Sequence, residues 1–334
     1  MQFGYSERCL AHDTGERHPE NPDRLRAIRR GLAKRHGVEY TEADPATREE
    51  VVAVHDEEYV DELETFVDDG GGSWDPDTVA SEGTWDAALT AAGLAQWAAR
   101  SALDGAEGRN TPFALGRPPG HHAVPDDAMG FCFFNNAAVA AQTVLDSGDA
   151  DRVAIFDWDV HHGNGTQDVF YDRGDVLYSS LHEDGLYPDT GDLEEIGRDD
   201  GEGTTVNLPL AAGAGDADYR YAIDEAIAPA IDRFDPDLLI VSAGFDAHRH
   251  DPISRMRVSS EGYAMMTDQV RSIADDVDAA DAYVLEGGYG LDTLADGVSM
   301  VHETYDGRTP VTDDEEPDAE TESLVAELRD LLDL

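Results

Sequence analysis

The sequence predicts an α/β protein whose central sheet is mostly parallel and is covered by helices on both faces. Two observations support this fold class. First, short apolar runs rich in β-branched residues alternate with segments of helical periodicity along the 334 residues, and such alternation is typical of parallel sheets. Second, four of the apolar runs end in small residues followed by a functional side chain, as strands do at the ligand-binding edge of open α/β sheets.

Caps, periodicity and chain breakers place the individual elements. Asn21 or Asp23 can cap the first helix, and Asn135 or Asn136 can cap the fourth. We expect helices over residues 23–35, 47–66, 84–103, 137–145, 217–234 and 260–277. We expect strands at the start of 3–14 and over residues 112–115, 152–160, 176–181, 238–243 and 283–285.

The C-terminal end differs from the rest in composition. Residues 309–322 read as an acidic linker, and a short helix follows whose apolar side contains Leu324, Leu328 and Leu331. We therefore predict a single domain over residues 1–308, with a linker and docked helix over residues 309–334.

The charge balance of the chain is strongly acidic. It has 73 Asp and Glu against 23 Lys and Arg, a net charge of -50, and the acidic residues are spread along the whole length. Such a surface repels itself in dilute buffer, and salt near 1 M, with a Debye length of ~3 Å, screens that repulsion. We predict a halophilic protein that needs roughly molar salt to fold and does not bind nucleic-acid phosphates.

Targeting signals are not apparent in the sequence. It has no run of 18 apolar residues, and its first residues lack a basic segment followed by an apolar one. The two cysteines, Cys9 and Cys132, make no disulfide framework. We expect a soluble, cytoplasmic protein without a membrane span.

The densest group of chemically capable side chains is the segment DWDVHHGNG, residues 157–165, which directly follows an apolar run. Because side chains alternate along a strand, Asp157, Asp159 and His161 would share one face if the extended geometry persists. Burying carboxylates and imidazoles together is costly unless a cation or hydrogen bonds compensate. We therefore predict a metal site here; a solvated loop tip is the alternative.

Three further strand ends carry functional side chains: His121 and His122, then Asp246, then Tyr289. A parallel sheet places all of these strand ends at one edge, together with residues 157–165. A catalytic zinc site keeps one position open for water and substrate, and three of these side chains can form such a site: Asp159, His161 and Asp246. Others can transfer protons or orient the groups that do: His121 and His122, with Asp157 and Asn164.

Five motifs occur in the order found in one known family: Arg-Pro-Pro-Gly-His-His-Ala from Arg117, Gly-Phe-Cys from Gly130, Asp-x-Asp-x-His-His-Gly-Asn-Gly from Asp157, Ala-Gly-Phe-Asp ending at Asp246 and Glu-Gly-Gly-Tyr ending at Tyr289. In these motifs the chain resembles the histone deacetylase family. The His-Pro-Glu segment at His18 and residue Asn164 resemble its class II branch, which adjoins the acetylpolyamine amidohydrolases. The resemblance implies an arginase-like fold and a zinc-dependent amidohydrolase that removes acetyl or other acyl groups from lysine side chains or related amines.

The resemblance also implies roles for individual residues. The zinc ligands would be Asp159, His161 and Asp246, and Tyr289 would polarise the acyl carbonyl. Proton transfer would fall to two supported histidines: His122, the general base and then general acid, supported by Asn164, and His121, its electrostatic partner, held by Asp157.

Three residues are implied to contact the substrate. Phe131 and Tyr187 would form walls of an acyl-lysine tunnel, and Tyr187 departs from the Phe usual in the family. Ile253 stands where polyamine-selective relatives carry a glutamate, which favours acyl-lysine over acetylpolyamines as substrate. The family also binds potassium, here through main-chain oxygens at Asp157, Asp159 and His161, with Ser180 and Leu181.

Two other interpretations compete with this one. A di-manganese ureohydrolase of the same fold would need more bridging carboxylates, but His248 stands where another Asp would be required. An inactive acyl-lysine-binding module is disfavoured because Tyr289 and both histidines are present. An acetylpolyamine deacetylase remains the alternative within the family. The physiological substrate, the oligomeric state and the choice between zinc and iron are open at this stage.

Overall fold

The computed structural model describes residues 1–15, 17–311 and 315–334, and in this part of the chain an eight-stranded sheet has the order β2-β1-β5-β10-β9-β6-β7-β8. Every strand pairing in this sheet is parallel. The strands are β1 Gln2–Gly4, β2 Glu39–Thr41, β5 Pro112–Ala114, β6 Val153–Asp157, β7 Val176–Glu183, β8 Thr205–Leu210, β9 Leu238–Ala243 and β10 Ala280–Leu285. A short antiparallel pair, β3 Gly72–Ser73 and β4 Val79–Ala80, lies apart from it.

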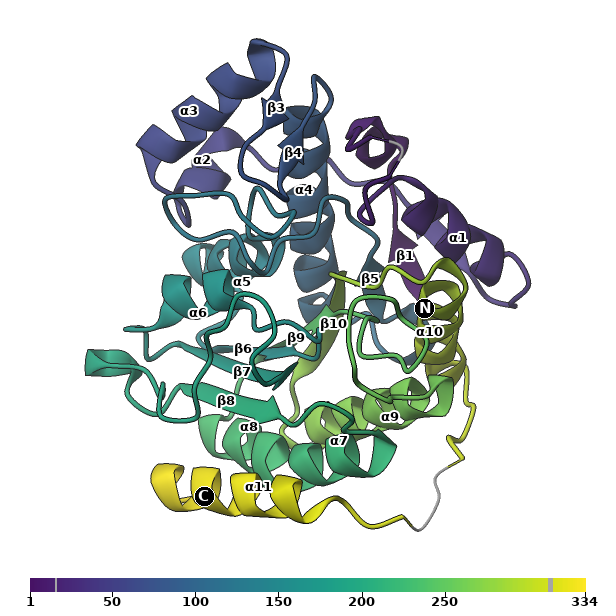
Figure 1. The fold of residues 1–334 in the computed structure, drawn as a ribbon, viewed down its shortest axis with the longest axis vertical. Helices are drawn as coiled ribbons and strands as arrows, with labels where there is room; N and C mark the ends of the chain where they lie inside the picture. The colour runs from purple at the N-terminus through teal and green to yellow at the C-terminus, as the bar shows by residue number, and fades with distance from the viewer. Residues whose placement is uncertain (16, 312–314) are drawn as a thin grey trace.

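Helices cover both faces of the sheet (Figure 1). One face carries α4 Thr84–Leu103, α5 Asn136–Ser147 and α6 Asn164–Phe170; the other carries α1 Asp23–Leu32, α7 Asp216–Ala222, α8 Ala228–Phe234, α9 Ser260–Asp276 and α10 Leu291–Tyr305. The central strands are buried on both sides; every residue of β9 is buried, for example. This explains why they read as continuous apolar runs. The predicted α/β fold class is confirmed.

The helix predicted over residues 47–66 is two helices, α2 Arg48–Val52 and α3 Glu57–Asp68. Between them the chain is held by a neighbouring loop: the buried His55 ring bonds Val124 O at 2.9 Å, and Asp56 N–H donates to Pro125 O at 2.7 Å. These contacts come from residues some 70 positions away, so the helical pattern of the segment gave no sign of the break.

The helix predicted over residues 217–234 is helical throughout, but a π-helical turn, Ile223–Ile227, separates α7 from α8. Pro229 supplies a physical reason, because it has no N–H to donate to the carbonyl four residues earlier. The wider π-helical turn accommodates the loss of that hydrogen bond, so the segment stays helical.

Among the strands of the eight-stranded sheet and the α-helices of the described residues, four were not predicted: β2, β8, α6 and α10. β2 and β8 are the two edge strands, and β8 contains Pro209, which an edge strand tolerates. Glycines at residues 163 and 165 flank Asn164 and usually break regular structure, yet α6 begins at Asn164. In α10 the apolar pattern is diluted by small residues such as Gly297, which packs against Phe245.

The C-terminal helix α11, Ala319–Leu332, packs against α7 and β8 (Figure 1). Its buried side chains are Thr321, Val325, Leu328 and Leu332. The predicted apolar side was partly wrong, because Leu331 is 41% exposed. Part of the predicted acidic linker, residues 312–314, lies outside the described residues. Among the described helices none is both long and apolar enough to cross a membrane.

Candidate active site

The site begins where β6 ends, at Asp157, three residues before the predicted end of this strand. Asp157 Oδ1 accepts a hydrogen bond from Asp159 N–H at 3.0 Å, and Asp159 Oδ1 accepts one from His161 N–H at 2.9 Å. Each aspartate thus bends the chain by bonding the backbone two residues on. The extended geometry on which the expected strand alternation depended therefore does not persist beyond Asp157, and two successive turns position these side chains.

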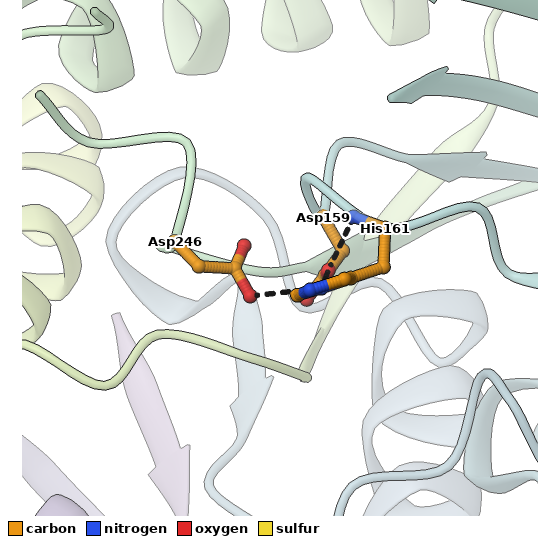
Figure 2. A group of neighbouring side chains, drawn as sticks. All are labelled: Asp159, His161 and Asp246. Atoms are coloured by element: carbon orange, nitrogen blue, oxygen red, sulfur yellow. Dashed lines mark hydrogen bonds and ion pairs between the residues drawn. The ribbon is translucent and has the colours of Figure 1, made fainter. Parts of the chain in front are cut away.

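Asp159, His161 and Asp246 form a group that could hold a metal ion. One potential ligand atom from each lies within 4.8 Å of the others, and all three residues are buried. Figure 2 shows them converging from two segments, residues 159–161 after β6 and Asp246 after β9. Asp246 Oδ1 accepts from Val160 N–H at 3.0 Å, whereas Oδ2 has no partner among the described residues apart from His161 Nδ1, 3.3 Å away. A buried carboxylate oxygen in that condition is suited to a cation.

Two glycines leave room for the carboxylates of Asp159 and Asp246. A side-chain carbon at Gly244 would collide with Asp159 Oδ2, and one at Gly287 would collide with the carboxylates of both Asp159 and Asp246. Gly287 N–H instead donates to Asp159 Oδ2 at 2.7 Å. The two carboxylates therefore sit in a cradle that only glycine permits.

The electrostatics of the group also favour a cation. Burial would lower the pKa of His161, but its hydrogen bonds to Asp159 and Asp246 raise that pKa to about 10. Burial would raise the pKa of Asp159, but the imidazoles of His121 and His161 hold it far below its ordinary value. Positive charge beside the two carboxylates is therefore stabilising. A proton on His161 or a divalent ion between the three side chains can supply it. Two carboxylates and one imidazole fit a single zinc-like ion.

The two adjacent histidines have different partners. His121 Nδ1 lies 2.9 Å from Asp157 Oδ2, and His122 Nδ1 lies 2.8 Å from Asn164 Oδ1. The two rings are tilted by 44° with centroids 4.0 Å apart, and the His122 ring lies 5.7 Å from that of His161. Both predicted supporting residues thus contact the histidines assigned to them.

These contacts separate the pKa values of the two histidines. Burial alone would lower the pKa of His121, but the Asp159 and Asp157 carboxylates raise it to about 10. Burial, followed by the charges of His121 and His161, lowers the pKa of His122 well below 6.5. At neutral pH one ring is a cation and the other a neutral base, which is the division that paired acid–base chemistry requires.

Tyr289 lies on a loop that three contacts fix in place. Its backbone N–H donates to Asp251 Oδ2 at 2.7 Å, and Arg24 Nε donates to Gly288 O at 2.8 Å. Gly288 has φ +115°, a conformation that side chains rarely allow. The Arg24 guanidinium also lies 5.0 Å from the centre of the Tyr289 ring. Burial raises the pKa of Tyr289 well above 10, so the phenol keeps its proton.

A cavity of about 240 Å³ leads to these groups. Its lining includes the three residues predicted to contact the substrate, Phe131, Tyr187 and Ile253, together with His122, His161 and Tyr289. Three lining residues were not predicted as site residues: Asp77, Gly130 and Leu186. Phe131 has φ 71°, which is uncommon for a bulky side chain. Its ring lies 5.8 Å from that of Tyr289, and the Tyr187 ring lies 5.1 Å from that of His122.

Sequence reasoning missed the buried charges that support the site. Glu286 Oε2 accepts from Gly120 N–H at 2.8 Å and from His121 N–H at 3.2 Å, so it holds the histidine loop. Behind Tyr289, the buried Glu20 pairs with Arg117 at 2.6 Å and with Arg24 at 3.3 Å. These residues were visible as parts of the motifs, but nothing in their spacing showed that they meet.

The segments assigned to a potassium ion lie side by side. Asp157 of β6 pairs with Ser180 of β7 in register, and Ser180 Oγ lies 2.9 Å from His182 Nδ1. The potassium site itself remains a prediction.

Fold and site together are typical of enzymes that activate water beside a metal ion. A family model described as the histone deacetylase domain matches residues 18–305. A histone deacetylase-like amidohydrolase of Pseudomonas aeruginosa is 38% identical over 336 residues, with 93% of this chain and 87% of that protein covered. A probable deacetylase of Archaeoglobus fulgidus is 42% identical over 294 residues, with 86% and 81% covered. The crystal structure of the HDA15 HD domain matches with a TM-score of 0.90 and 37% identity, over 99% of this chain and 96% of that one.

The chain belongs to the histone deacetylase family, as its motifs predicted. Membership makes it a hydrolase of the deacetylase type.

Proposed function

We propose that the enzyme removes acetyl groups from lysine side chains, using a zinc ion held by Asp159, His161 and Asp246. The observation that carries the proposal is the narrow cavity whose lining joins His161 to His122 and Tyr289. Bound there, zinc would supply a Lewis acid for the acyl carbonyl and would lower the pKa of a water molecule. The remaining steps are those of the chain's own residues.

His122 is the proton acceptor in this proposal. The oxygen of Asn164 can only accept, so His122 Nδ1 carries a proton and Nε2 is left as the basic nitrogen. Its low pKa keeps it neutral and ready to take a proton from water at neutral pH. The same nitrogen would then return the proton to the leaving amine, while His121 and Asp157 hold compensating charge beside it.

Tyr289 stabilises the charge that develops on the carbonyl oxygen. Its phenol is protonated and partly buried at the cavity, and its loop is fixed by Arg24 and Asp251. A donor held in advance where an oxyanion forms loses little free energy to reorganisation during the reaction.

The cavity walls suit the aliphatic part of a lysine side chain. Phe131, Leu186 and Ile253 are apolar, and the Tyr187 ring presents an apolar face with one hydroxyl. Each buried methylene contributes ~0.8 kcal/mol of transfer free energy, so a lysine stem gains affinity from these walls. A potassium ion held by main-chain oxygens near Asp157 and Ser180 is part of the proposal.

Acetylpolyamine hydrolysis is the second candidate, and one carboxylate favours it. Asp77 lies in the cavity lining and could attract the distal ammonium of a polyamine. Ile253, in the same lining, offers no charge, which is why acyl-lysine is preferred here.

One assay tests the proposal. The metal-analysed enzyme would be given acetyl-lysine peptides and acetylspermidine at equal concentration, in molar potassium chloride. We expect one zinc per chain and a higher kcat/KM for the peptides. Ile253→Glu should shift the preference towards acetylspermidine, and Asp77→Asn should shift it away. A wild-type preference for acetylspermidine would overturn the substrate assignment, and two manganese ions per chain would overturn the metal assignment.

A further inference from the structure

The strongest concentration of positive charge in this acidic chain lies on and just beyond α1. Residues 23–35 contain six of the 23 Lys and Arg but one of the 73 Asp and Glu. Arg24 is buried behind the site, whereas Arg26, Arg30 and Lys34 are exposed and Arg29 and Arg35 are partly exposed. On a molecule with net charge -50, this is a local reversal of the surface potential.

A groove of about 660 Å³ lies beside this helix, at the outer edge of the molecule where α1 and β1 are seen in Figure 1. Its volume falls within the range of natural ligand-binding clefts. Four arginines and two tyrosines contribute to its lining: Arg26, Arg29, Arg30, Arg35, Tyr5 and Tyr40. Arg24 is not part of the lining of the groove, and the groove shares no residue with the cavity of the active site.

Arg29 and the two tyrosines form a stack at this groove. The Arg29 guanidinium lies 4.4 Å from the centre of the Tyr5 ring and 5.2 Å from that of Tyr40. Tyr40 is 40% exposed, which is unusual among the large apolar side chains of the described residues. Arginine and tyrosine held rigidly and partly exposed are the residue types that dominate binding energy at protein interfaces.

Internal ion pairs leave part of this charge uncompensated. Arg35 pairs with Glu303 at 2.6 Å, and Arg26 pairs with Asp23 at 2.9 Å on an exposed surface. Arg29 forms a long ion pair, 3.8 Å, with the exposed Glu7. Arg30 has no ion pair with any described residue. Cations in the last turn of α1 do stabilise the helix dipole. That role explains neither an exposed tyrosine nor the groove beside it.

The groove ends at an open edge of the sheet. Tyr40 is the middle residue of β2, the outermost strand, and β2 pairs with β1 alone in the part of the chain that the structure describes. The free side of such a strand can bond the backbone of an added extended segment. A small anion would use the arginines only, whereas an extended peptide would use the arginines, the tyrosine face and the strand edge together.

We propose that the groove between α1 and β2 docks an extended, carboxylate-rich peptide segment of a partner protein. Its carboxylates pair with Arg29 and Arg30, whose planar donors suit carboxylates, and its backbone adds to β2. The acidic remainder of the surface repels such a segment, so binding is confined to this groove. The proposal does not depend on the deacetylase chemistry.

Fluorescence anisotropy tests this with a labelled, lysine-free peptide that alternates glutamate with valine and threonine. The salt would be the lowest at which circular dichroism shows the native fold. Arg30→Glu and Arg29→Gln should each weaken binding by about tenfold or more, as loss of an interface arginine does. Arg198→Glu is the matched control, because Arg198 also stacks on a tyrosine beside one acidic residue, but in the segment between β7 and β8 at the other end of the sheet.

We expect the control to bind like wild type and all variants to keep deacetylase activity, which verifies folding. A peptide with N-methylated backbone amides should bind more weakly if β2 receives it. The proposal is overturned if the wild-type protein does not bind the peptide, if Arg198→Glu weakens binding equally, or if ATP or inorganic phosphate displaces the peptide at similar concentration. Unchanged affinity of the N-methylated peptide would overturn docking on β2.

Discussion

Two carboxylates buried at opposite ends of the central sheet, Asp159 and Asp281, have different surroundings. At the carboxyl end, Asp159 is held beside the imidazoles of His121 and His161, which bring positive charge and lower its pKa. At the amino end, Asp281 on β10 accepts hydrogen bonds from two hydroxyls, those of Tyr305 and Thr111, and burial raises its pKa to about 6. Hydroxyls stabilise a buried carboxylate less than a neighbouring cation does. The surroundings of Asp159 are therefore organised around positive charge, whereas those of Asp281 tolerate a carboxyl group that can be neutral.

The largest effect should come from removing a carboxylate at the charged end. Asp246→Ala takes away a proposed ligand and should abolish both metal binding and deacetylase activity, measured by elemental analysis and peptide assay. Asp281→Asn, a carboxylate removed at the other end, is the control and should keep both. A fully active, metal-bearing Asp246→Ala protein would contradict the assignment.

Next in size is the loss of the Tyr289 hydroxyl. Tyr289→Phe removes one preorganised donor, which typically lowers kcat by about 10²–10³. The ring is retained, so metal content and thermal stability should hardly change. Turnover within a few-fold of wild type would show that this hydroxyl does not stabilise the oxyanion.

A smaller effect should follow from disturbing the support of His122. Asn164→Ala removes the acceptor that fixes the proton on Nδ1, and loss of such an orienting partner typically costs about 10–100-fold in activity. Asn164→Asp keeps an acceptor at that place and should retain more activity than Asn164→Ala. Equal activity in the two variants would mean that Asn164 does not set the tautomer of His122.

The smallest effect concerns stability at the amino end. Since the pKa of Asp281 is raised to about 6 in the folded state, its stabilising contribution is complete below the unfolded value near 4 and is lost as the pH rises through about 6. The side chain of Asp281→Asn does not titrate. As the pH rises through that window, the variant should therefore lose less unfolding free energy than the wild type, by about 1–2 kcal/mol. Denaturant unfolding of both proteins at constant salt measures the difference. Identical pH profiles would show that Asp281 is not the group responsible.

Local patterns predicted the parts of the fold in which each residue's surroundings are uniform. β9 was predicted with its observed bounds, Leu238–Ala243, because a strand buried on both faces is apolar at every position. β2 was not predicted because its residues are exposed or half-buried, and β8 because Thr205, Asn207 and Pro209 interrupt its apolar pattern although the strand is almost entirely buried. The break at His55 was not predicted because its cause is a distant loop. The site group was predicted for a similar reason: strand ends that carry polar side chains are visible one segment at a time.

The sequence by itself determined the fold class and the side chains available for chemistry, since buried strands, chain breakers and the polar residues that follow them are short-range patterns. Only the tertiary structure decided how those side chains are held. Arg24 reaches Gly288 across 264 positions, and Glu286 reaches Gly120 across 166. Asp246 Oδ2 meets His161 Nδ1 at 3.3 Å only because β9 lies next to β6. Hydrogen bonds and charge pairs act over a few ångströms in space. The number of residues between two partners does not show whether the fold brings them that close.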